Sequence, residues 1–223
     1  MIKDYLEVNT KSIVLLGDFN PKIIQPFWLS SKNIIRENEA SNAKIDVIHN
    51  ELVRYQIEDW ASFNITPQKF EIRSSKEPYF EPLKDLVISI FSVLKETPIE
   101  AVGINHIYHY SLRSYEKYTK FGEKLASLNL LNDILNEPKL LGIEFIEKNR
   151  KDKLKGHYRF KIEPSDEIDP SQYGISININ DHISKQESKS TGSFEIIKIF
   201  QENWLNSNKR AELITENLWK KLM

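Results

Sequence analysis

The chain has 223 residues, of which 40% are hydrophobic and 28% charged, and its 31 basic and 32 acidic side chains leave a net charge of −1. This balance is typical of one large or two small globular domains and excludes a disordered chain. It also argues against a nucleic-acid binder, although a local basic patch stays possible. Cysteine is absent, which excludes disulfides, thiolate catalysis and cysteine-ligated zinc.

No segment predicts export or membrane insertion. The first residues lack a basic stretch followed by a long apolar run, so they do not resemble a signal peptide. The longest apolar-rich window, 86–94, is about half of the ~20 residues that a membrane span needs. We therefore expect a cytoplasmic protein.

The first 97 residues predict the order strand, helix, three strands, helix. A buried apolar run stops at Asn20-Pro21, because proline cannot donate to a strand ladder. The clearest element is a helix whose apolar residues recur at steps of three and four. The predicted elements are a strand at 12–19, a helix at 23–35, a loop at 37–42, a strand at 45–57 bent near 50–51, a hairpin of 60–65 and 69–74, and a helix at 79–95.

The rest of the chain predicts the same order a second time. Ser114 can cap a helix, and three later segments alternate apolar and polar residues as strands do. The last helix carries a possible break at 206–208. The predicted elements are a strand at 100–112, a helix at 114–128, strands at 140–147, 157–163 and 173–180, and a helix from 193 onward.

Together these elements predict an α+β fold of two similar β-α-β-β-β-α halves, 12–97 and 98–223, within one compact unit. We expect a curved, mostly antiparallel sheet backed by long helices at 79–95 and 193–205. The likeness of the halves lies in element order alone, so chance recurrence of common patterns is the alternative. Helices on one side would leave the other face of the sheet as the expected contact surface.

Two histidines, His106 and His109, fall in the predicted strand 100–112. On a helix, histidines three residues apart can share a metal ion. On a strand they point to opposite faces. We therefore interpret both as residues of the sheet rather than as a metal site.

Asn180, Asp181 and His182 stand at the end of the strand predicted at 173–180. A histidine beside a carboxylate can serve as a general base or a metal-binding pair. Asn-Asp is also a common turn pair, and the turn interpretation is favoured.

Asp18 and Asn20 lie at the end of the strand predicted at 12–19, in the run Gly-Asp-Phe-Asn-Pro. Asp18 can bind a cation or orient a base, or it can accept backbone N–H groups in the turn, and the turn interpretation is favoured. If the two strand ends meet, Asp18, Asp181 and His182 would form one polar cluster.

The segment 148–156 is strongly basic and resembles a nucleic-acid-binding hook, but it contains no aromatic residue for stacking on bases. A solvated hairpin tip is the favoured interpretation. Its basic residues are Lys148, Arg150, Lys151, Lys153 and Lys155.

Signatures of cofactor and hydrolase sites are missing. The sequence has no GxGxxG, GxxxxGK[ST], HExxH or GxSxG motif, and its 7 glycines leave little for a phosphate-binding loop. We therefore predict no cofactor and no metal centre.

The motifs Gly-Asp-Phe-Asn-Pro (17–21), Gly-Ile-Asn (103–105) and Asn-Asp-His (180–182) resemble those of a sporadically distributed prokaryotic family without assigned activity. The resemblance runs over most of the chain. It implies the architecture above and a prokaryotic cytosolic setting, with an association with defence or mobile genes. It supplies no catalytic residues.

The leading functional hypothesis is a non-catalytic module that binds a protein partner or a second copy of itself. The first alternative is a metal-dependent enzyme or sensor built on the strand-end Asp and His residues. The second is nucleic-acid binding through 148–155.

Overall fold

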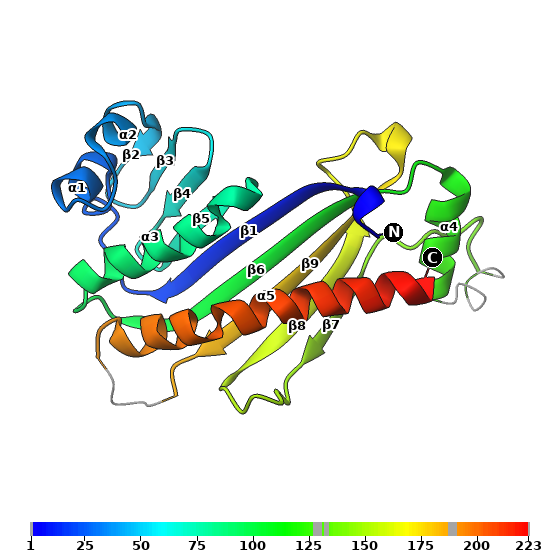
Figure 1. Ribbon diagram of the computed structural model, residues 1–223. Coiled ribbons are helices and arrows are strands. Elements are labelled where there is room, and N and C mark those ends of the chain that lie inside the picture. The colour runs from blue at the N-terminus through cyan, green and yellow to red at the C-terminus, as the bar shows by residue number, and fades with distance from the viewer. Residues whose placement is uncertain (1, 127–130, 132–133, 187–190, 223) are drawn as a thin grey trace.

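The computed structural model describes residues 2–126, 131, 134–186 and 191–222, and it has the predicted α+β fold. All strands belong to one nine-stranded antiparallel sheet in the order β2-β3-β4-β5-β1-β6-β9-β8-β7 (Figure 1). The strands are β1 (Leu6–Gly17), β2 (Lys44–Ile48), β3 (Val53–Ile57), β4 (Ala61–Ile65), β5 (Lys69–Ser74), β6 (Ile99–Ser111), β7 (Ile143–Glu147), β8 (Gly156–Pro164) and β9 (Gly174–Ser184).

In the described residues, five α-helices and three short 3-10 turns connect and cover the strands. Ser114 caps one of the helices, as predicted, by accepting a hydrogen bond from the backbone N–H of Lys117. The helices are α1 (Pro26–Ser31), α2 (Glu37–Ser41), α3 (Phe80–Val93), α4 (Tyr115–Leu125) and α5 (Phe194–Leu222), and the 3-10 turns are η1 (Ile2–Asp4), η2 (Glu77–Tyr79) and η3 (Pro170–Gln172).

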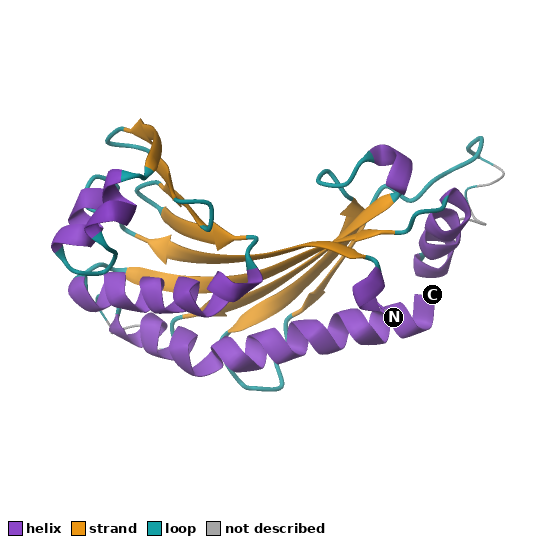
Figure 2. Cartoon of the chain, turned by 45° about the horizontal axis from the view of Figure 1, so that its top comes forward, coloured by secondary structure: helices purple, strands orange, loops and turns teal. Residues whose placement is uncertain are grey.

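The helices α3 and α5 lie on one face of the sheet, which we call the covered face (Figure 2). One apolar cluster joins α3 and the first part of α5, through Phe200 and Trp204, to the strands from β3 to β6. A second cluster joins the last part of α5, through Trp219, to α4, β6, β8 and β9. The core is therefore divided into two along the length of α5.

The opposite face of the sheet carries mostly polar side chains, and we call it the open face. Alternation along the strands places Ser12 of β1, Asn105 of β6 and Asn180 of β9 in one row across it. At one end the β8–β9 loop folds over this face, where Oγ of Ser165 lies 2.8 Å from Nδ1 of His109. The middle of the open face is left without a covering helix (Figure 2).

Three predicted elements differ from the structure near the N-terminus. The helix predicted at 23–35 is shorter, because α1 begins at Pro26 and ends at Ser31. The loop predicted at 37–42 is the helix α2, whose start is stabilised by a hydrogen bond from the backbone N–H of Arg36 to the Glu39 carboxylate. The strand predicted at 45–57 is a hairpin of β2 and β3.

The break predicted at 206–208 is also wrong, because α5 continues through 29 residues. Its polar residues Ser207 and Asn208 bond to side chains of the sheet, so tertiary contacts hold a stretch of weak helix formers in the helix. Of the helix predicted at 114–128, residues 127 and 128 lie outside the described residues. Within the described chain, no helix combines the length and apolarity needed to cross a membrane.

Candidate functional site

A band of buried polar residues crosses the covered face beneath the middle of α5, between the two apolar clusters. Lys11 of β1 lies opposite His106 of β6 in the ladder, and Asp181 of β9 lies opposite Tyr158 of β8. All four are buried. The band contains two separate clusters, one around Lys11 and one around Arg150.

Lys11 is 6% exposed, and its ammonium group is held by neutral groups. Nζ donates to Nδ1 of His106 at 3.1 Å and to Oδ1 of Asn208 at 2.6 Å. It lies 5.0 Å from the ring centroid of Phe80 and 5.7 Å from that of Trp204, within the range of cation–π attraction. In the described part of the chain no carboxylate pairs with it, and burial lowers its pKa from the usual 10.5 to about 8.

His106 is a buried imidazole that stays neutral. Burial, helped by the charge of Lys11, lowers its pKa well below the usual value. Because Lys11 donates to Nδ1, the ring proton is assigned to Nε2, which donates to Oγ of Ser207 at 3.1 Å. His109 lies on the open face, so the two histidines point to opposite faces as the strand alternation predicts.

Lys11 lines a groove of about 600 Å³ between α5, η2 and the start of β1. This volume is that of a typical small-molecule site. Oδ1 of Asn9, another lining residue, is buried and has no hydrogen-bond partner among the described residues. Other lining residues are Glu77, Phe80, Tyr108, Tyr110, Leu205 and Glu212.

The second cluster surrounds Arg150, whose side chain is 1% exposed. Its guanidinium donates to Oδ1 of Asp181 at 2.6 Å, to both carboxylate oxygens of Asp152 at 2.9 and 2.7 Å, and to the backbone oxygen of His182 at 3.1 Å. Burial opposes the charged form, but the hydrogen bonds to Asp152 and Asp181 outweigh it and raise the pKa of Arg150. The prediction of a solvated tip is wrong at this residue, because the β7–β8 loop folds inward and buries it.

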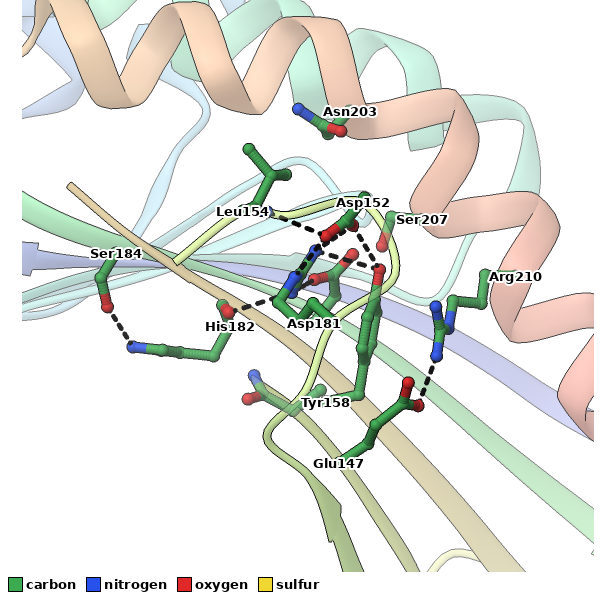
Figure 3. Close-up of polar contacts among 12 residues, drawn as sticks. Glu147, Asp152, Leu154, Tyr158, Asp181, His182, Ser184, Asn203, Ser207 and Arg210 are labelled. Carbon is green, nitrogen blue, oxygen red and sulfur yellow. Dashed lines mark hydrogen bonds and ion pairs between the residues drawn. The ribbon is translucent and has the colours of Figure 1, made fainter. Parts of the chain in front are cut away.

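Tyr158 connects the Arg150 cluster to α5. Its hydroxyl accepts a hydrogen bond from Arg150 at 3.0 Å and donates to Asp152 at 3.2 Å. The guanidinium carbons of Arg150 and Arg210 lie 4.1 and 3.7 Å from its ring centroid, and Arg210 also pairs with Glu147 of β7 (Figure 3). These contacts attach the loop, the sheet and the helix to one another.

Asn180, Asp181 and His182 lie within β9 rather than after it, so the favoured turn interpretation is wrong. The physical reason is the buried pairing of Asp181 with Arg150, which lets a turn-favouring residue stay in a central strand. Asp181 faces the covered side, whereas Asn180 and His182 face the open side.

The ladder also keeps Asp18 apart from these residues. Val14 of β1 lies opposite Gly103, which lies opposite His182. Asp18 is four residues further along, so roughly 16 Å separates it from His182 at ordinary strand spacings. Asn20 accepts a hydrogen bond from the backbone N–H of Lys22 in the following turn. Within the described residues, no group of three His, Asp or Glu side chains is arranged to hold a metal ion.

The other basic residues of the β7–β8 loop remain at the surface. Lys148, Lys151, Lys153 and Lys155 are exposed. Since Arg150 is neutralised internally, only these four residues of the predicted hook are available to a ligand.

On the open face, small side chains form the middle and longer charged ones flank it. The amide of Asn180 donates to Oδ1 of Asn105 at 2.7 Å, and a Cβ atom on Gly103 would lie 2.9 Å from that amide nitrogen. His157 and His182 stack with their ring centroids 4.7 Å apart. Burial is the main cause that lowers the pKa of both imidazoles.

No family model matches this chain, and no curated protein matches it. Interpretation of the site therefore rests on the geometry alone.

Lys11 and its groove were not predicted from the sequence. A signal was present, because Asn9, Lys11, Ile13 and Leu15 alternate along one face of β1. A lysine that shares a strand face with apolar residues indicates a buried ammonium group. The predicted strand began at residue 12, one residue too late to include Lys11.

Proposed function

We propose that the protein is a non-catalytic binding module and that the open face of its sheet holds a protein partner. The main support is the row of polar side chains across the centre of that face. No helix covers this face over the middle of the sheet in the described part of the chain (Figure 2). A polar row that runs across neighbouring strands suits a macromolecule better than a small ligand.

The charges of the open face favour a protein over a nucleic acid. Arg54 and Arg73 are exposed and make no ion pair within the described residues. Acidic residues lie among the basic ones and pair with them across this face. The ion pairs are Lys69–Glu71, Arg159–Glu144 and Lys161–Glu163. The strand residues of this face include no Phe, Tyr or Trp that could stack on bases.

Photo-crosslinking in the host cell tests this proposal. A photo-reactive residue replaces Arg73 or Asn178 on the open face, and Lys198 or Lys209 on the exposed side of α5 serves as the matched control. We expect both open-face positions to give an adduct with the same protein, and the control positions to give none. Absence of an adduct, or equal adducts from both sides, would contradict the proposal.

A second contact is proposed at β7, for self-association with another copy of the chain. This strand is an edge of the sheet, its pairing with β8 is regular, and Phe145 and Ile146 are 52% and 50% exposed. The other edge, β2, has a register shift between Ile45 and Val47, and such shifts blunt strand edges. Light scattering should find a dimer that Ile146→Lys converts to a monomer, whereas a monomeric unsubstituted protein would refute this contact.

We also propose that the sheet is curved and derives from two successive copies of one unit, 12–97 and 98–223. Strand pairing supports this, because β1 pairs with β5, β6 pairs with β9, and α3 and α5 follow these last strands. The units differ in that four strands follow the helices of the first and three follow the helix of the second. Superposition of the two should place β1 on β6 and α3 on α5.

The resemblance to a patchily distributed prokaryotic family leads to a proposal about the partner. We expect it to be encoded beside this chain, in a defence or mobile gene cluster. Identification of the crosslinked protein as the product of a distant, unrelated gene would count against this.

A further inference from the structure

The Lys11 groove lies on the covered face, away from the proposed partner surface, and it carries a different chemistry. Three features occur together there: a buried amine, neutral hydrogen-bond partners, and a groove that Lys11 itself lines. None of the three contributes to protein binding on the open face.

We propose that the groove is a binding site for small aldehydes or ketones, with Lys11 Nζ as the nucleophile that forms a reversible imine. A buried lysine without a carboxylate partner is the arrangement in which the neutral amine becomes accessible near neutral pH. Arg150, in the same polar band, cannot take this role because a guanidinium stays protonated.

The surroundings of Lys11 fit a neutral carbonyl compound. Phe80 and Leu205 offer apolar walls, and Oδ1 of Asn9 is a buried acceptor that has no partner among the described residues. The groove combines four glutamates with three lysines, so an anion gains little from entering it. A carbonyl compound with an aromatic or aliphatic body and a hydroxyl group to donate to Asn9 matches this lining.

The reaction balances without a further reagent. The ammonium group of Lys11 first releases a proton to solvent, and the free amine attacks the carbonyl carbon to form a carbinolamine. Loss of water then gives the imine, with both hydrogens of the amine leaving in that water. Before the imine forms, His106 holds Nζ in place, because its Nδ1 accepts a hydrogen bond from the ammonium or from the amine.

The fraction of Lys11 that is a neutral amine also supports imine formation in this groove. With a pKa of about 8, Lys11 carries roughly 300-fold more neutral amine at pH 7 than a lysine with the ordinary value of 10.5. The charged or titratable groups that face the groove around it are His106, Tyr108 and Tyr110 of β6, Glu77 of η2, Glu81 of α3, Lys209, Glu212 and Glu216 of α5, and Lys3 of η1. Glu212, Glu81 and Glu77 raise the pKa of Lys11, so they limit the effect of burial.

Reductive trapping tests the proposal on the intact chain. The protein is treated at pH 7 with benzaldehyde and cyanoborohydride, and the modified lysines are mapped by mass spectrometry. We expect Lys11 to be modified at least about tenfold faster than Lys209, which lines the same groove but is exposed. In urea this preference should vanish. No modification of Lys11, or a rate within twofold of that of Lys209, would overturn the proposal.

Two surface variants distinguish a reactive amine from a merely structural one. Glu212→Gln removes the largest influence that raises the pKa of Lys11, so modification of Lys11 at pH 7 should become about twofold faster. Glu202→Gln changes an exposed carboxylate of the same helix that neither lines the groove nor is among those influences, and it should leave the rate unchanged. Equal rates in both variants and the unsubstituted protein would also count against the proposal. Neither result depends on the open face. The proposal of imine formation at Lys11 can therefore be refuted without affecting the proposal of protein binding on the open face.

Discussion

Two buried cations lie on the same face of the sheet, beneath the same helix, and are held in opposite ways. Arg150 pairs with the carboxylates of Asp152 and Asp181. Lys11 pairs with no carboxylate among the described residues and instead donates to His106 and Asn208. Burial acts against both charges, but only Arg150 has counter-charges in contact that offset it.

Arg150 therefore has a structural role, whereas the amine of Lys11 is the one that we propose to be available for chemistry. The Arg150 cluster joins the β7–β8 loop, β9 and, through Tyr158 and Arg210, the helix α5. It is enclosed, with its donors satisfied by oxygen acceptors. The Lys11 cluster is adjacent to a groove and keeps an amine whose charge is easily lost.

The largest expected effect comes from Arg150→Met. The substitution leaves Asp181, 2% exposed, without its cation, and breaking a buried pair in this way lowers the free energy of unfolding by about 3–5 kcal/mol. Urea unfolding measures it. Lys151→Met, at the exposed neighbouring position, should cost no more than about 0.5 kcal/mol, and a loss below about 1 kcal/mol for Arg150→Met would remove the structural role.

The next effect is a pH dependence specific to Lys11. The pKa is about 8 in the folded state and near 10.5 unfolded, so between these values the unfolded chain binds more protons. The free energy of unfolding of the unsubstituted protein should therefore rise by about 2–3 kcal/mol relative to that of Lys11→Met between pH 8 and 10. Parallel pH profiles for the two proteins would mean that Lys11 keeps an ordinary pKa.

At pH 7, Lys11→Met should change the free energy of unfolding by no more than about 1.5 kcal/mol in either direction. Removal of a buried charge is favourable, and it offsets the loss of the hydrogen bonds to His106 and Asn208. Thermal unfolding of the Lys11→Met and Arg150→Met proteins under the same conditions compares the two losses of stability. Equal losses in the two variants would erase the distinction between the clusters.

The smallest effect is expected from Asp152→Asn. The side chain of Asp152 is 34% exposed, so solvent screens its attraction to Arg150, and Asp181 remains to balance the charge. We expect a loss of about 1 kcal/mol or less in urea unfolding. A loss as large as that of Arg150→Met would show that Asp152, not Asp181, is the main counter-charge.

Local patterns were enough to predict much of the fold. The spacing of apolar residues located α3, and alternation located β6 and β8 to within a few residues. Thr66 and Pro67 correctly marked the turn between β4 and β5. In the helix and the strands the signal lies within one element, where burial of one face fixes the pattern, and in the turn it lies in a few adjacent residues.

The site depended on contacts between distant parts of the chain, which no local pattern carries. Asp181 resembles a turn residue until Arg150, 31 positions earlier, is known to neutralise it. Asn208 resembles a helix breaker until its bond to Lys11, 197 positions away, is seen. The polar band was therefore missed for one physical reason, namely that tertiary pairing overrides the local preference of each residue.

The most direct test of the difference between the two cations is the titration of Lys11 itself. Lysine labelled with carbon-13 at Cε can be followed by NMR from pH 6 to 11, with the Lys11→Met protein identifying the signal. We expect a midpoint near pH 8 for Lys11 in the folded protein. A midpoint at or above 10.5 would show that its ammonium group is as well stabilised as an exposed one, and the proposed reactivity of the groove would be contradicted.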